Sequence, residues 1–141
     1  MSFYLDACAI LPLLVHEPAC QIVQRFFSAA DQPLIVNEFA AAEVASGLSR
    51  RARTGSLTLE EATAGLAQFD VWRAALTVDL DLQAADFRLA NVFVRRFDLG
   101  LRAPDALHAA VCRRADLCLV TLDRRLATAA QALGVRVEIP A

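Results

Sequence analysis

The sequence predicts an α/β fold with a mainly parallel central sheet covered by helices on both faces. Short strand-like runs alternate along the chain with longer stretches of helical periodicity. The strand-like runs are apolar throughout, which is typical of parallel strands buried on both faces. Because 141 residues with 57% hydrophobic content suit one core, we expect a single domain over residues 1–141.

The individual elements follow from local signals in chain order. Three helix starts are marked by Asn37 as a cap, by Thr58 and Glu61 as a capping box, and by Pro104 in a first turn. Strands are expected at residues 3–5, 34–36, 77–78 and 117–121 and after Gly134. Helices are expected at residues 7–15, 20–27, 38–53, 58–76, 82–97 and from 104, and between 123 and Gly134.

Composition excludes several classes of protein. All 14 basic residues are arginine, so mechanisms that need an amine are closed, including the phosphate-signalling receivers and aspartyl-phosphate phosphatases whose sites use a lysine. The net charge of -2 gives no overall electrostatic signature of nucleic-acid binding. The four cysteines lack the spacing of a metal site and are expected to be small buried hydrophobes.

The same composition argues against a membrane. The longest stretches without a charged side chain, residues 7–16 and 126–135, are about half the ~20 apolar residues of a spanning helix. Asp6 interrupts the position where the apolar part of a secretory signal would run. We therefore expect a cytoplasmic protein with no membrane contact.

Three aspartates occupy positions where ligands bind in parallel sheets. Asp6 follows the first strand, Asp123 follows the fourth, and Asp105 lies in the first turn of a helix. Ligands of such sheets bind outside the carboxyl ends of the strands, so these side chains are candidates for one site. Helix capping is an equally good explanation for each aspartate alone.

Glu43 needs a partner. It is the one charged residue between Phe39 and Ser49, on a helix that we expect to be largely buried. A buried carboxylate is costly unless it is paired or bound to a cation. Arg50, two turns further along a similar face, is one candidate partner, and a divalent cation shared with the three aspartates is the other.

The number of acids favours the cation. Four carboxylates repel one another at close range, whereas Mg²⁺ or Mn²⁺ takes hard oxygen ligands and neutralises the cluster. A cation held by carboxylates keeps several waters and acts on phosphates, where it activates a water and polarises phosphoryl oxygens. Phosphodiester hydrolysis is therefore the predicted chemistry.

Four motifs together resemble the PIN-domain ribonucleases, and their order and separation are similar to those of the small bacterial VapC-type toxins. The motifs are Tyr4-Leu5-Asp6, Ala42-Glu43-Val44, the run from Pro104 to Ala109 and the run from Leu119 to Asp123. The resemblance covers nearly the whole chain. It implies a three-layer α/β/α fold and a Mg²⁺- or Mn²⁺-dependent endoribonuclease whose catalytic and metal-binding residues are Asp6, Glu43, Asp105 and Asp123.

The resemblance also implies partners: an RNA substrate, a small cognate antitoxin of the VapB type and a second copy of the chain in a homodimer. The alternative is a PIN-like scaffold that keeps the acids for structural reasons and acts only by binding proteins. Ala7-Cys8 departs from the family, which often has a hydroxyl or amide two residues after the first aspartate. This departure implies a weaker hydrogen bond near the metal and a slower cleavage.

Residues around the acids complete the prediction. Thr121 is a candidate polar contact behind the metal ligands, although threonine is also a common strand residue. His108 is expected to be packed or hydrogen-bonded without a catalytic role. Arg124 and Arg125, and then Arg50, are candidates for RNA phosphate contacts, although an arginine near a helix end also complements the helix dipole.

Overall fold

A computed structural model describes all 141 residues and contains one five-stranded sheet, in which every neighbouring pair of strands is parallel. The strand order is β3-β2-β1-β4-β5. The strands are β1 (Phe3–Leu5), β2 (Leu34–Ile35), β3 (Thr77–Val78), β4 (Cys118–Val120) and β5 (Arg136–Glu138). The predicted α/β fold with a parallel sheet is confirmed.

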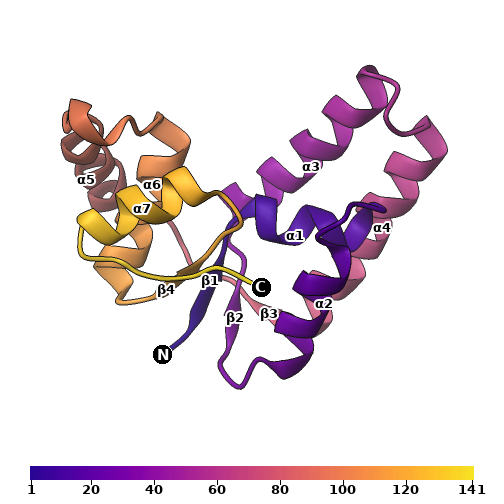
Figure 1. Ribbon diagram of the computed structural model, residues 1–141, viewed down its shortest axis with the longest axis horizontal. Helices are drawn as coiled ribbons and strands as arrows, with labels where there is room; N and C mark the ends of the chain where they lie inside the picture. Colours follow the sequence, from indigo (N-terminus) through magenta and orange to yellow (C-terminus); the bar gives the residue numbers. More distant parts are fainter.

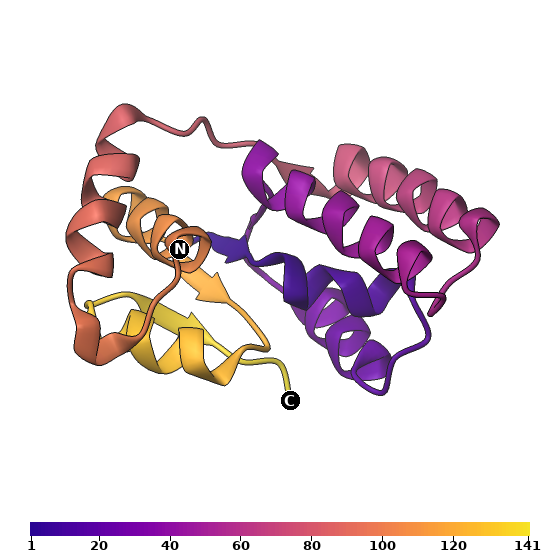
Figure 2. The same cartoon turned by 90° about the horizontal axis from the view of Figure 1, so that it is seen from above.

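Seven helices connect and cover the strands. They are α1 (Ala7–Leu14), α2 (Cys20–Ala29), α3 (Glu38–Arg53), α4 (Leu59–Leu76), α5 (Ala84–Val94), α6 (Ala103–Ala115) and α7 (Arg124–Ala132), with a 3-10 turn at Phe97–Leu99. No helix is both long enough and apolar enough to cross a membrane. Figures 1 and 2 show α1 to α4 on one side of the sheet and α5 to α7 on the other.

Alternate residues of each strand contribute to two separate hydrophobic cores, one on each face of the sheet. Tyr4 and Leu119 pack on the side of α5, α6 and α7, whereas Leu5 and Val120 pack on the side of α1, α3 and α4. All four side chains are fully buried. The strands are apolar at every position because both of their faces are covered, and the predicted three-layer α/β/α arrangement is confirmed.

The predicted helix signals have clear physical outcomes. The Asn37 side chain accepts a hydrogen bond from the amide of Ala40, and Thr58 and Glu61 form the complete capping box. The helix predicted at 82–97 is shorter: α5 begins after Gln83, whose amide donates to the Asp86 carboxylate, and it ends at Val94.

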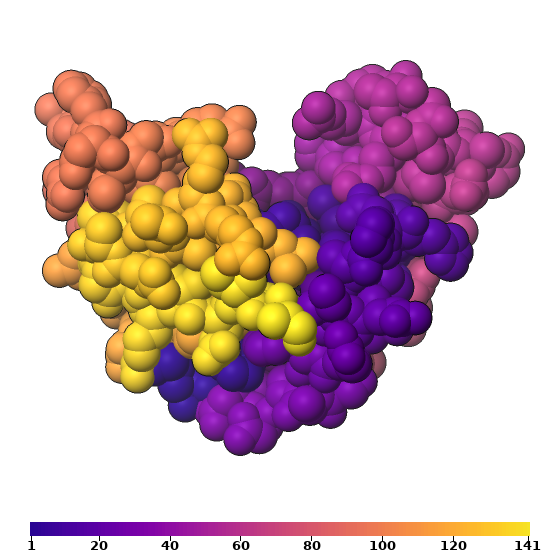
Figure 3. Space-filling view, viewed as in Figure 1, coloured from indigo at the N-terminus to yellow at the C-terminus, as the bar shows by residue number.

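The α3 helix is not largely buried, as its composition suggested. Only Ala40, Val44 and Leu48 of this helix are buried. Together with α4 it forms a hairpin that projects beyond the sheet (Figures 1 and 2). A β-carbon at Gly47 would lie 2.7 Å from Leu11 Cδ1, so the bare glycine lets α3 approach α1 closely. The space-filling view shows a hollow between this hairpin and the opposite group formed by α5 and α6 (Figure 3).

Candidate active site

The register of the two central strands brings Asp6 beside Thr121. Leu5 of β1 pairs with Val120 of β4, and the Asp6 amide continues the ladder by donating to the Val120 carbonyl at 3.0 Å. The next residue of each chain segment therefore leaves the sheet at the same place. Parallel strands end at a common edge, which is why residues 115 positions apart in the sequence meet here.

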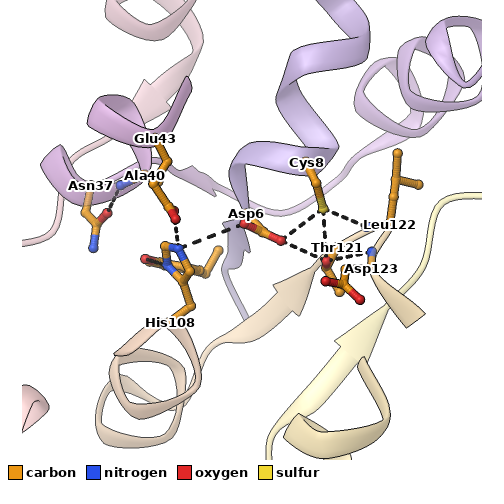
Figure 4. A network of polar contacts seen from close by, with 10 residues as sticks. Asp6, Cys8, Asn37, Ala40, Glu43, His108, Thr121, Leu122 and Asp123 are labelled. Atoms are coloured by element: carbon orange, nitrogen blue, oxygen red, sulfur yellow. Dashed lines mark hydrogen bonds and ion pairs between the residues drawn. The ribbon is translucent and has the colours of Figure 1, made fainter. Parts of the chain in front are cut away.

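The Asp6 carboxylate is held by two side-chain donors. Its Oδ2 accepts hydrogen bonds from Thr121 Oγ1 at 2.9 Å and from Cys8 Sγ at 2.9 Å (Figure 4). Asp6 makes no side-chain capping bond to α1, so the capping explanation is wrong for this residue. Oδ2 is thus fixed from behind, and Oδ1 faces the interior of the site.

Cys8 lies two residues after Asp6, at the position where the resemblance to the family implied a weaker hydrogen bond near the metal. Burial, followed by the negative charge of Asp6, raises the pKa of the Cys8 thiol to about 12. The thiol therefore stays protonated and remains a donor to Asp6. Its sulfur also accepts from the Leu122 amide at 3.3 Å, so Cys8 ties the start of α1 to the loop after β4.

The partner of Glu43 is His108 and not Arg50. The Glu43 carboxylate hydrogen-bonds to Nε2 of His108, whose other ring nitrogen, Nδ1, lies 2.6 Å from the Tyr4 hydroxyl. Burial lowers the pKa of His108, but the hydrogen bond and charge of Glu43 and the charges of Asp6 and Asp105 together raise it above the ordinary value. Arg50 is exposed near the end of α3, about 10 Å further along the helix axis.

Asp6, Glu43 and His108 form one compact group. One ligand-type atom from each of these residues lies within 4.8 Å of the others, and Nε2 of His108 is 3.9 Å from Asp6 Oδ1. Figure 4 shows the three side chains converging from β1, α3 and α6. His108 is fully buried, whereas the Glu43 side chain is about 29% exposed and reaches the group from the open side.

Asp105 and Asp123 lie on the other flank of Asp6. Both line a pocket of about 240 Å³ together with Arg102 and Arg125. Burial raises the pKa of Asp105, and the charges of Asp6 and Asp123 raise it further, against the opposing charges of Arg102 and His108. Asp105 is therefore near enough to both aspartates to repel them.

Asp123 also caps a helix. Its Oδ1 accepts from the amides of Arg125 at 2.9 Å and Leu126 at 3.2 Å, as the capping explanation predicted for this residue. The Asp123 amide in turn donates to Thr121 Oγ1 at 3.0 Å. One threonine hydroxyl consequently connects Asp6 to the backbone that carries Asp123.

The donor set fits a hard divalent cation. No arginine forms an ion pair with Asp6, Glu43, Asp105 or Asp123, because the arginine ion pairs of this chain all use other acids. The one basic side chain within the group is His108. Several carboxylates without structural counter-ions, one of them with a raised pKa, are an arrangement that Mg²⁺ or Mn²⁺ stabilises.

The predicted phosphate-binding arginines lie at different distances from the acids. Arg125 lines the pocket with Asp105 and Asp123, and both Arg124 and Arg125 line the adjoining surface pocket on α7. Both arginines are exposed and neither is paired with an acid. Arg50 is exposed as well, but the structure does not place it beside the carboxylates.

Comparison with known proteins assigns the fold to a family. Residues 3–132 match the PIN domain. The chain belongs to the PIN domain family. It is 33% identical over 127 residues to Ribonuclease VapC3 of Pyrobaculum aerophilum, a match that covers 90% of this chain and 93% of that protein. The resemblance to VapC-type PIN domains that the four motifs indicated is confirmed.

Solved structures agree with this PIN fold. The crystal structure of VapC20 from Mycobacterium tuberculosis, a sarcin-ricin loop cleaving toxin, has a TM-score of 0.73 at 16% identity, covering 90% of this chain and 94% of that one. VapBC2 from Rickettsia felis, solved with a DNA fragment from its promoter, has a TM-score of 0.72 at 13% identity, covering 99% and 98%. At these identities the likeness concerns the fold.

Sequence reasoning missed several polar residues of this PIN domain. It allowed His108 a hydrogen bond but did not name Glu43 as its partner, and it gave Tyr4 and Arg102 no place in the site. The three-residue spacing of Asp105 and His108, which puts both on one face of α6, was the available signal for His108. The sequence contains no such signal for Tyr4, because a tyrosine in an apolar strand is equally well explained as a core residue.

Proposed function

We propose that this PIN domain is a divalent-metal-dependent endoribonuclease of the VapC type that hydrolyses RNA phosphodiester bonds. The observation that carries the proposal is the convergence of Asp6 and Glu43 beside Asp105, with no arginine paired to any of them. The name of the 33% identical relative, a VapC ribonuclease, supports the same activity. The alternative of an inactive scaffold offers these carboxylates one basic side chain, His108, and no arginine ion pair to offset their repulsion.

In this mechanism Asp6 and Glu43 hold Mg²⁺ or Mn²⁺ together with Asp105, and Asp123 completes the acidic set from the α7 side. When bound, the cation supplies an activated water and stabilises the charge that develops on the phosphate. Thr121 and Cys8 keep the Asp6 carboxylate oriented by donating to Oδ2. The pKa of Asp105 is raised by burial and by its acidic neighbours, and a bound cation would favour its ionised form.

RNA enters along the hollow between the α3–α4 hairpin and the group formed by α5 and α6 (Figure 3). We assign its phosphates first to Arg125 and Arg124, which lie beside the acidic pocket, because neither arginine has an acidic partner. Arg50, on the projecting hairpin, contacts the strand further from the cleaved bond. Charge-assisted contacts of this kind position the backbone without reading its sequence.

We further propose that the chain is the toxin of a VapBC-type pair, neutralised by a small VapB-type antitoxin, and that it forms a homodimer. Support for the antitoxin comes from the fold shared with VapBC2, which was solved as a toxin-antitoxin complex. The half-exposed side chain of Phe87 on α5, which lines an apolar pocket together with Val94, provides a surface for a second copy. Sedimentation of the purified chain alone and with its antitoxin tests both statements.

Cleavage of a long phage RNA of mixed sequence tests the activity. The purified chain without antitoxin is expected to cut this RNA with Mg²⁺ or Mn²⁺ and to stop when EDTA is added. Asp6→Asn removes a metal ligand with little change of shape and should reduce the rate by at least about 100-fold. Asp31→Asn, at an exposed position without side-chain partners, is the matched control and should cleave like wild type. Cleavage by Asp6→Asn at the wild-type rate would reject the assignment.

A further inference from the structure

We infer that His108, held in place by Tyr4, is a positioning residue that donates a hydrogen bond from Nε2 to Glu43 and is neither a metal ligand nor a general base. This inference deepens the proposed function and rests on it where it assigns Glu43 to the cation. The observation behind it is the continuous chain of contacts from Tyr4 through His108 to Glu43, built from β1, α6 and α3.

The proton on Nε2 follows from the partners at both ends of this chain. A carboxylate oxygen only accepts, so the ring nitrogen that contacts Glu43 carries the hydrogen. At the other end, the Tyr4 hydroxyl is fully buried and lies 2.6 Å from Nδ1, to which it can donate its hydrogen. If the ring is doubly protonated, Nδ1 donates to the Tyr4 oxygen instead. In both cases Nε2 is a donor.

The surroundings of the imidazole prevent it from turning away. His108 and Tyr4 are both fully buried. The centroid of the His108 ring lies 5.5 Å from that of Tyr4 and 5.2 Å from that of Phe39, so aromatic side chains pack against the ring from two directions. A ring locked in this way presents Nε2 at a fixed point, whereas Glu43 is a long and partly exposed side chain that loses conformational freedom when it is ordered.

The two carboxylates that face the imidazole ring lie at different distances from its Nε2 atom. Nε2 is within hydrogen-bond distance of Glu43 but 3.9 Å from Asp6 Oδ1, which is too far for a hydrogen bond. The hydrogen on Nε2 therefore occupies one oxygen of Glu43, and the other oxygen and Asp6 Oδ1, which do not share this hydrogen bond, would be available to a cation. A nitrogen that carries a hydrogen has no lone pair to give a metal.

Three variants and wild type test this assignment by Mn²⁺ titration in the absence of RNA. His108→Leu removes the donor, and Mn²⁺ affinity should fall by about 10- to 100-fold. His108→Gln keeps an N–H donor near the position of Nε2 and should recover most of the affinity. Tyr4→Phe removes only the outer contact and should produce a smaller loss. Thermal unfolding of each variant identifies any that do not fold.

Imidazole ¹⁵N resonances of the wild-type protein supply a test that needs neither metal nor RNA. The chain has two histidines, so the signal that disappears in a folded His108 variant assigns His108. We expect its Nε2 to carry a hydrogen. A bare Nε2 would overturn the inference, and so would His108→Gln with Mn²⁺ affinity as low as that of folded His108→Leu. Wild type that binds Mn²⁺ but leaves RNA intact would instead overturn the proposed function alone.

Discussion

The two flanks of Asp6 are built in different ways. On one flank the Glu43 carboxylate is held by a hydrogen bond with His108, and Asp6 itself is held by the donors Thr121 and Cys8. On the other flank Asp105 and Asp123 line an open pocket beside two arginines, and their arrangement depends on charge and on the cap of α7. The comparison teaches that one cluster of acids combines a side held by side-chain hydrogen bonds with an open side that depends on charge and a helix cap.

The largest effect is expected where the two flanks are joined. Thr121→Val removes the hydroxyl that donates to Asp6 and accepts from the Asp123 amide, which leaves that amide without its partner. The free energy of unfolding should fall by about 1–3 kcal/mol in urea denaturation. Mn²⁺ affinity should fall by about 10- to 100-fold. Thr128→Val, at an exposed position on α7, is the control and should change neither quantity appreciably.

Two substitutions of Asp123, on the open flank, distinguish its role as a helix cap from the effect of its negative charge. Asp123→Ala removes the acceptor for the Arg125 and Leu126 amides and should lower the free energy of unfolding by about 1 kcal/mol. Asparagine caps helices about as well as aspartate, so Asp123→Asn should keep the stability and lose only the charge. Thermal unfolding of the pair checks this difference. Equal destabilisation by both substitutions would show that the charge, and not the cap, holds this segment.

The pH dependence of stability tests the repulsion between Asp105 and the other acids of the open flank. The pKa of Asp105 in the folded protein lies above the ordinary 3.8, so between these two values the folded protein binds more protons than the unfolded chain. The contribution of Asp105 to stability therefore falls as the pH rises through this window. With EDTA present, wild type should lose stability relative to Asp105→Asn over the same window. A constant difference between the two proteins would contradict the repulsion described above.

The smallest effect is expected at Cys8. A thiol is a weak donor, so its bond to Asp6 contributes less than a hydroxyl would. Cys8→Ser should therefore cleave RNA at least as fast as wild type. Cys8→Ala, which lacks any donor, should be slower by no more than about tenfold, the equivalent of one hydrogen bond. A Cys8→Ser variant slower than Cys8→Ala would mean that sulfur has a role beyond hydrogen bonding.

Much of the fold could be predicted because its signals are local. The caps at Asn37 and Thr58 depend on residues three positions apart, and they fixed the starts of α3 and α4. The positions of Asp6 and Thr121 at one sheet edge followed from the general geometry of parallel strands. The shorter α5 is a local miss, since Gln83 was not identified as its cap.

The pairing within the site could not be predicted in the same way. Glu43 meets His108 because the first turns of α3 lie near α6 before the helix runs away from it, an arrangement set by tertiary packing and not by sequence spacing. Composition also suggested a buried α3, but only Ala40, Val44 and Leu48 of that helix are buried, and its other small residues are partly or fully exposed. Small side chains are compatible with close packing and with an open groove, and the sequence alone does not distinguish the two.

The central claim is that these carboxylates form a divalent-cation site, and calorimetric titration of Mn²⁺ into the metal-free protein tests it most directly. We predict saturable binding that Mg²⁺ competes for, that Asp6→Asn and Glu43→Gln each weaken by at least about tenfold, and that Asp31→Asn leaves unchanged. Wild type without saturable binding, or binding that survives both substitutions at full affinity, would contradict the account.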